Sequence, residues 1–117
     1  MSPIPQSALR EYERCALLSD LRHYDMRLQN HREFIKKHDW LAPTVLDDYE
    51  HVVGMACVAC QHYIDMRCAD SGVPKPSALD LPPHHKNGVS VVSIVNAAAN
   101  YWKHNSGWPK KDTSGRW

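Results

Sequence analysis

The chain has little of several things that would narrow its function. It contains one phenylalanine and five glycines, and its 14 basic and 13 acidic residues leave a formal net charge of +1. A balance this close to zero gives no global reason to expect a nucleic acid or a membrane surface as partner. The first residues carry no apolar signal core, and no apolar run approaches membrane-span length. We therefore expect a cytoplasmic protein with no membrane partner.

What the chain does have is helical periodicity. At 117 residues it suits one domain, which we place at residues 1–117. Apolar residues recur at three- and four-residue steps over about 7–38, and Leu21, Leu28 and Ile35 share one heptad position. A second helix is predicted over about 45–69, with Thr44 as its N-cap and Gly72 as its stop. Four prolines then predict an extended loop over 72–88.

A third helix is predicted over about 89–104, followed by a tail at 105–117. Its first half is rich in β-branched residues, so a strand is the competing interpretation. Helix is favoured because an alanine run follows without a break. The packing face of this helix is predicted to hold Val91, Val95, Ala98 and Trp102.

These elements predict an all-α fold, an antiparallel helical bundle with two long helices, a proline-rich loop and a third helix. Three helices of such unequal length do not close a core as readily as four do. Long amphipathic helices with wide apolar faces need partners, so we expect a second copy of the chain to complete the bundle.

The four cysteines include Cys57 and Cys60, with His62 close behind and Cys68 further along. A Cys-x-x-Cys-x-His cluster suggests zinc, but structural zinc usually takes its ligands from a knuckle and not from mid-helix. The three cysteines fall on the apolar face of the predicted helix and His62 points away from it. We therefore favour core packing and expect no metal and no cofactor.

The third helix carries a polar stripe at Ser93, Asn96, Asn100 and His104. Side chains four residues apart meet on one helix face, and His104 lies at the C-terminus, where the helix dipole favours a protonated imidazole. A histidine so placed can act as a general acid or bind phosphate, and Lys103 adds positive charge. Tyr101 offers a stacking surface to a base. The alternative is a histidine that caps the helix and asparagines that face water.

The segment Ala-Asn-Tyr-Trp-Lys-His, residues 99–104, resembles the helix motif of HEPN domains. Members are all-α proteins of toxin–antitoxin, phage-defence and RNA-processing systems, and active members are metal-independent ribonucleases that dimerise around a shared cleft. The resemblance implies that His104 and Asn100 are catalytic and that Lys103, Asn96 and Tyr101 bind RNA. The position of the motif arginine falls on Ala99, or on Ala97 or Ala98 under a longer spacing, and none of these residues is basic.

Two functions follow from these observations. One is a HEPN-like protein that binds or cleaves RNA as a homodimer, with an antitoxin-like protein as a further partner. The other is a non-catalytic helical module that binds a protein or a second copy of itself, which the missing motif arginine and the heptad-like faces favour.

Overall fold

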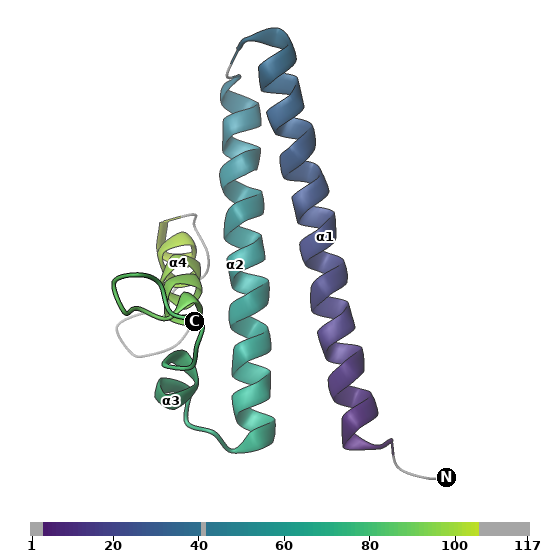
Figure 1. Cartoon of the computed structure of the whole chain (residues 1–117). Helices are drawn as coiled ribbons and strands as arrows, with labels where there is room; N and C mark the ends of the chain where they lie inside the picture. Colours follow the sequence, from purple (N-terminus) through teal and green to yellow (C-terminus); the bar gives the residue numbers. More distant parts are fainter. Residues whose placement is uncertain (1–3, 41, 106–117) are drawn as a thin grey trace, which may run out of the picture. The chain divides into compact units, whose positions relative to one another are not determined.

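The computed structural model describes residues 4–40 and 42–105, which are helical for most of their length. The helices are α1 (Gln6–His38), α2 (Pro43–Ser71), α3 (Lys75–Leu79) and α4 (Val91–Asn105). Figure 1 shows the two long helices α1 and α2 and the two shorter ones that follow. The all-α prediction and the two long helices are confirmed. None of the helices in the described part of the chain has the length and apolar character that crossing a membrane requires.

The chain divides into two compact units, Met1–Ala59 and Cys60–Trp117, which we call the N-terminal and the C-terminal unit. The helix α2 contributes its first part to one unit and its last part to the other.

In the N-terminal unit, α1 and the first part of α2 form an antiparallel helix pair (Figure 1). The predicted heptad positions Leu21, Leu28 and Ile35 are partly buried, as a packing seam requires. α1 is continuous through Asn30 and ends where Asp39 takes a left-handed conformation with φ of 48°.

The start of α2 differs from the prediction. The backbone N–H groups of Val45 and Leu46 donate to Ala42 O at 3.0 Å each, so the helix begins at Pro43. Proline suits the first helical position because its missing N–H has no intrahelical partner there. Thr44 therefore lies inside the first turn, and the prediction that it caps the helix is wrong.

In the C-terminal unit, α2 extends to Ser71 and ends as predicted at Gly72. Its φ is 70°, and its N–H donates to Cys68 O at 3.0 Å. The region predicted as a loop, 72–88, contains the short helix α3. An ion pair of 2.7 Å from Lys75 to Asp65 joins the start of α3 to α2.

The chain between α3 and α4 has defined backbone pairing. His85 N donates to Val89 O at 2.7 Å, Gly88 N donates to His85 O at 2.8 Å, and an isolated antiparallel bridge links His84 to Ser90. Ser90 Oγ then accepts from Ser93 N at 3.0 Å, which makes Ser90 the N-cap of α4. The third helix thus begins at Val91, two residues later than predicted.

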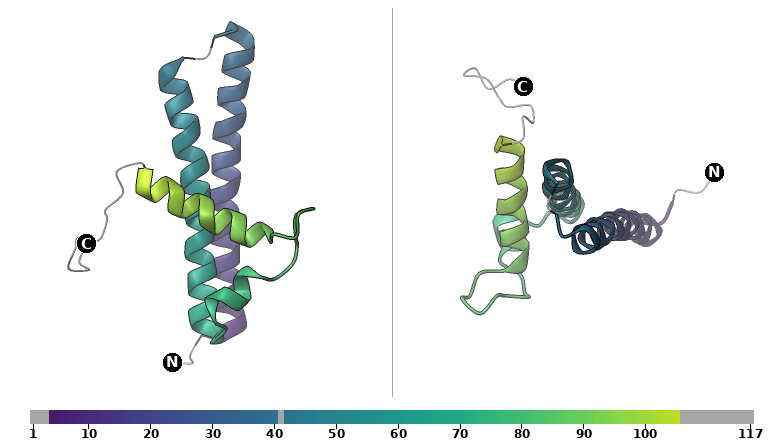
Figure 2. Two further views of the ribbon diagram at one scale, coloured as in Figure 1. Left: turned by 90° about the vertical axis from the view of Figure 1, so that its left-hand side faces the viewer. Right: turned by 90° about the horizontal axis from the view of Figure 1, so that it is seen from above.

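Figure 2 shows α3, the loop and α4 beside the last part of α2. The end of α4 takes in Asn105, and the rest of the predicted tail lies outside the described residues. The predicted packing face of α4 is found in part. Val95 and Trp102 are partly buried, whereas Val91 and Ala98 are exposed, and Ala99 is 0% exposed in place of Ala98.

Few side chains of the described residues are fully buried. The buried hydrophobic residues among them are Ala42, Val52 and Ala99. By contrast, fifteen large hydrophobic residues are exposed, including Tyr12 at 73% and Met26 at 64%. A chain that buries so little apolar surface gains little hydrophobic stabilisation as a monomer.

Candidate functional site

The polar stripe of α4 is held by one side chain of α2. Gln61 is 3% exposed, and its Nε2 donates to Asn96 Oδ1 at 2.9 Å and to Asn100 Oδ1 at 2.8 Å. The two asparagines lie one helical turn apart, so a single amide reaches both. We call these three residues the amide cluster. It lies wholly within the C-terminal unit and joins two helices through side-chain amides.

The amide cluster fixes the orientation of the Asn100 side chain. Since Asn100 Oδ1 accepts from Gln61, its Nδ2 group is left as a donor on a residue that is itself exposed. Asn96 is only partly exposed and belongs to the packed face. One predicted site residue is therefore a solvent-facing amide with a fixed orientation, and the other is mainly a packing residue.

The remaining predicted residues occupy the last turn of α4. His104 is exposed, Tyr101 is 72% exposed, and Lys103 is partly buried. Lys103 and His104 are the basic residues of this turn, where the negative end of the helix dipole favours positive charge. The structure brings Asn96 and Asn100 together through Gln61. Among the described residues, no hydrogen bond joins Tyr101, Lys103 and His104 to one another.

Ala99, one of the three alanines at which the HEPN resemblance places an arginine, is a packing residue. It is completely buried, so a guanidinium at this position would have to displace its neighbours or lose its hydration. Ala97 and Ala98, the positions under a longer spacing, are exposed and would admit a longer side chain. None of the three carries the phosphate-binding charge that the resemblance assigns to the arginine.

No protein-family model, curated protein or solved structure matches this chain. A functional assignment therefore depends on the chemistry of α4 and on the other polar clusters of the molecule.

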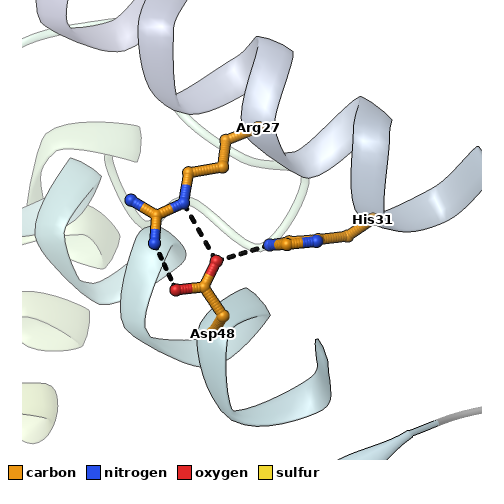
Figure 3. A network of polar contacts seen from close by, with 3 residues as sticks. All are labelled: Arg27, His31 and Asp48. Carbon is orange, nitrogen blue, oxygen red and sulfur yellow. Dashed lines mark hydrogen bonds and ion pairs between the residues drawn. The ribbon is translucent and has the colours of Figure 1, made fainter. Parts of the chain in front are cut away.

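Sequence analysis missed a second polar cluster, in the N-terminal unit. Figure 3 shows Asp48 of α2 between Arg27 and His31 of α1. Arg27 donates to both carboxylate oxygens, with Nε at 2.9 Å from Oδ2, and His31 Nε2 also donates to Oδ2. The hydrogen bond from His31 is the main cause that lowers the pKa of Asp48 below 3.8. Arg27 acts in the same direction, and partial burial opposes both.

This second cluster links α1 to α2 through side-chain hydrogen bonds. Arg27 and His31 both donate to the one carboxylate, which accepts on both oxygens. The sequence signal was limited to Arg27 and His31 at i, i+4 spacing. Nothing local indicated that Asp48, and not its neighbour Asp47, would lie opposite them.

The cysteine cluster does not form a ligand set. The four cysteines all lie in the described part of the chain and form no disulfide there, and Cys57, Cys60 and Cys68 are partly buried. Burial raises the pKa of the Cys57 thiol, which disfavours the thiolate that a metal needs. Across residues 4–40 and 42–105, no three His, Cys, Asp or Glu side chains are grouped so that they would hold a metal ion.

Proposed function

We propose that this chain is a cytoplasmic, HEPN-like helical module that works as a homodimer and binds single-stranded RNA with the last turn of α4. The observation that carries the proposal is the amide cluster. Gln61 orients Asn100 so that its free amide N–H groups lie one turn before the exposed His104. An amide donor and an imidazole at this spacing suit a phosphate oxygen.

The neighbouring side chains supply the other contacts that RNA needs. Tyr101 is 72% exposed, so its ring is open for a base to stack on. Lys103 and His104 bring positive charge to the same turn. A second copy of the turn, supplied by a dimer, would double a patch that is small in one chain.

RNA binding is tested with a fluorescently labelled single-stranded RNA and fluorescence anisotropy at low salt. Tyr101→Ala should weaken binding by at least about fivefold, because stacking on one base contributes about 1–3 kcal/mol. Trp40→Ala is the control, since Trp40 is an aromatic residue that is 59% exposed and lies between α1 and α2. Wild-type protein that does not bind, or equal effects of the two substitutions, would refute the proposal.

Cleavage is a separate question, tested in the same mixture with EDTA present. Without an arginine at position 99, we expect slow cleavage or none, and His104→Ala should abolish whatever is seen. His62→Ala serves as control because His62 is exposed on α2. Cleavage that survives His104→Ala would remove His104 from any catalytic role while leaving the binding measurement intact.

A second candidate function is favoured by a different observation. Four exposed apolar residues of α1 fall within a sector of about 100° when each residue turns by about 100°. They are Leu9, Tyr12, Met26 and Phe34. We call them the α1 stripe. A chain with so few buried hydrophobic residues gains from covering such a stripe, and a second copy offers the same stripe in return.

On this second reading the protein is a homodimerisation module with no RNA partner. Sedimentation equilibrium should show a dimer that Met26→Glu dissociates, because Met26 is 64% exposed within the stripe. Leu18→Glu is the control, since Leu18 is also exposed but lies on another side of α1. A monomer at every concentration would rule out this function and would also remove the dimer from the RNA proposal.

A further inference from the structure

The outer face of α1 carries three exposed residues at exact heptad spacing. Tyr12, Ser19 and Met26 follow one another at seven-residue steps, so they fall within a sector of about 40° on the helix. Tyr12 is 73% exposed and Met26 64%, and Ser19 is exposed as well. Leu28 of the partly buried seam lies about 180° away from Ser19, so this face points away from α2. We call these three residues the α1 triplet.

The α1 triplet is symmetric about its centre. Ser19 is small, and one large apolar side chain stands seven residues before it and another seven residues after it. At about 1.5 Å per residue, each large side chain lies about 10 Å from Ser19 along the helix axis. A second α1 that runs antiparallel, with Ser19 opposite its own counterpart, therefore places Tyr12 of each copy opposite Met26 of the other. A thioether against the edge of an aromatic ring is a favourable contact.

The charges of α1 favour the antiparallel direction over the parallel one. Residues 6–21 carry three acidic and two basic side chains, whereas residues 22–38 carry two acidic and five basic ones. Arg27 is already paired with Asp48 of α2, and the second half of the helix stays positive without it. A parallel pair would place two positive halves side by side. An antiparallel pair places each positive half beside the acidic half of the other copy.

We propose that two copies of this chain pair through α1 in antiparallel orientation, with the two-fold axis at Ser19 and with Tyr12 of each copy against Met26 of the other. The inference rests on the homodimer of the proposed function, to which it adds the surface and the direction of pairing. Its contacts come from the α1 triplet alone and use no residue of the last turn of α4.

Disulfide cross-linking tests the position of the axis. The full chain carries Cys15→Ser, which removes the exposed native thiol of α1 and gives the background from the other cysteines. Adding Ser19→Cys places two thiols at the axis. Cβ atoms joined by a disulfide lie about 3.5–4.5 Å apart, so only a residue at the axis links to its own counterpart. Mild oxidation should link Ser19→Cys at least about tenfold faster than Leu18→Cys, because pairing raises the local thiol concentration.

Leu18→Cys is the matched control, since Leu18 is exposed but its side chain is turned by about 100° from that of Ser19. A second pair of variants tests the direction. In the proposed pair, Tyr12 lies about 21 Å along the helix axis from its own counterpart. Tyr12→Cys should therefore not link to itself, but a mixture of Tyr12→Cys and Met26→Cys should give the mixed disulfide, which mass spectrometry of the peptides identifies.

Sedimentation equilibrium of the wild-type chain separates two kinds of failure. A monomer at every concentration would overturn both the homodimer and the antiparallel pairing. A dimer in which Ser19→Cys links no faster than Leu18→Cys would overturn the pairing alone and leave the homodimer to another surface. Linking of Tyr12→Cys to itself would mean a parallel pair and would also overturn the inference. The Ser19→Cys variant keeps Tyr12 and Met26, so it decides the outcome even if substitution of either weakens the dimer.

Discussion

Replacing Gln61 separates hydrogen bonding from packing in the amide cluster. Gln61→Leu removes two hydrogen bonds, of 2.9 and 2.8 Å, which together contribute about 1–3 kcal/mol. It also removes Gln61 Oε1, which is buried without a partner and costs about 1–3 kcal/mol. The two terms nearly cancel, so we expect a change in the free energy of unfolding within about 1 kcal/mol.

Gln61→Ala removes the same polar groups and adds a cavity. Gln61 is 3% exposed, so the deleted atoms leave space that the neighbouring helices fill only in part. We expect the alanine variant to be about 2–3 kcal/mol less stable than the leucine variant. Urea unfolding followed by far-ultraviolet circular dichroism measures both, provided that the urea dependence stays unchanged.

The comparison of the two variants can refute this reasoning. If the leucine variant is clearly more than about 1 kcal/mol less stable than wild type, the hydrogen bonds outweigh the orphan oxygen, and the balance above is wrong. If the alanine variant is as stable as the leucine variant, the cavity contributes nothing. The leucine variant also tests the proposed function, because it frees Asn100 without unfolding α4. RNA binding should then weaken although stability does not change, and an unchanged Kd would show that the orientation of Asn100 is irrelevant.

Three further predictions concern stability alone. Asp48→Asn should lower the free energy of unfolding by about 1–2 kcal/mol at neutral pH. Because the folded pKa of Asp48 lies below its usual range, the stabilisation is present above the unfolded pKa and is lost as pH falls through the folded pKa. Acid unfolding curves of wild type and variant should therefore converge. Gly72→Ala should cost about 1 kcal/mol from its φ of 70°, since no atom lies near the added methyl group, and thermal unfolding checks this. Ser90→Ala should cost about 1–2 kcal/mol, because Ser90 caps α4 and also donates to Leu79 O, and chemical denaturation reports the loss.

The helices were predictable where the signal is local. The apolar period of α1 and the stop at Gly72 both depend on residues a few positions apart, and both appear in the structure. The start of α4 was misplaced because the β-branched run at 89–95 carries no boundary of its own. The boundary comes from Ser90, whose hydroxyl accepts from Ser93 N and donates to a carbonyl at the end of α3.

The residues of the candidate site could be predicted from the sequence, but not which way their face of α4 points. The spacing of Asn96, Asn100 and His104 places them near one face of a helix, yet it does not say whether that face meets water or another helix. The answer comes from Gln61, which lies 35 residues before Asn96 and carries no local signal of the contact. For the same reason, the sequence did not indicate that Arg27 and His31 bond to Asp48 on another helix.

The burial of Ala99 limits where a positive charge of α4 can meet a phosphate. The packed face of α4 passes through Asn96 and Ala99, so any charge that meets a phosphate must come from residues beyond that face. Within α4 those residues are Lys103 and His104, at the end of the helix where the dipole favours positive charge. A side chain fixed mid-helix positions a phosphate more firmly than an exposed last turn does. If the chain binds RNA as proposed, this arrangement favours binding of RNA over its cleavage.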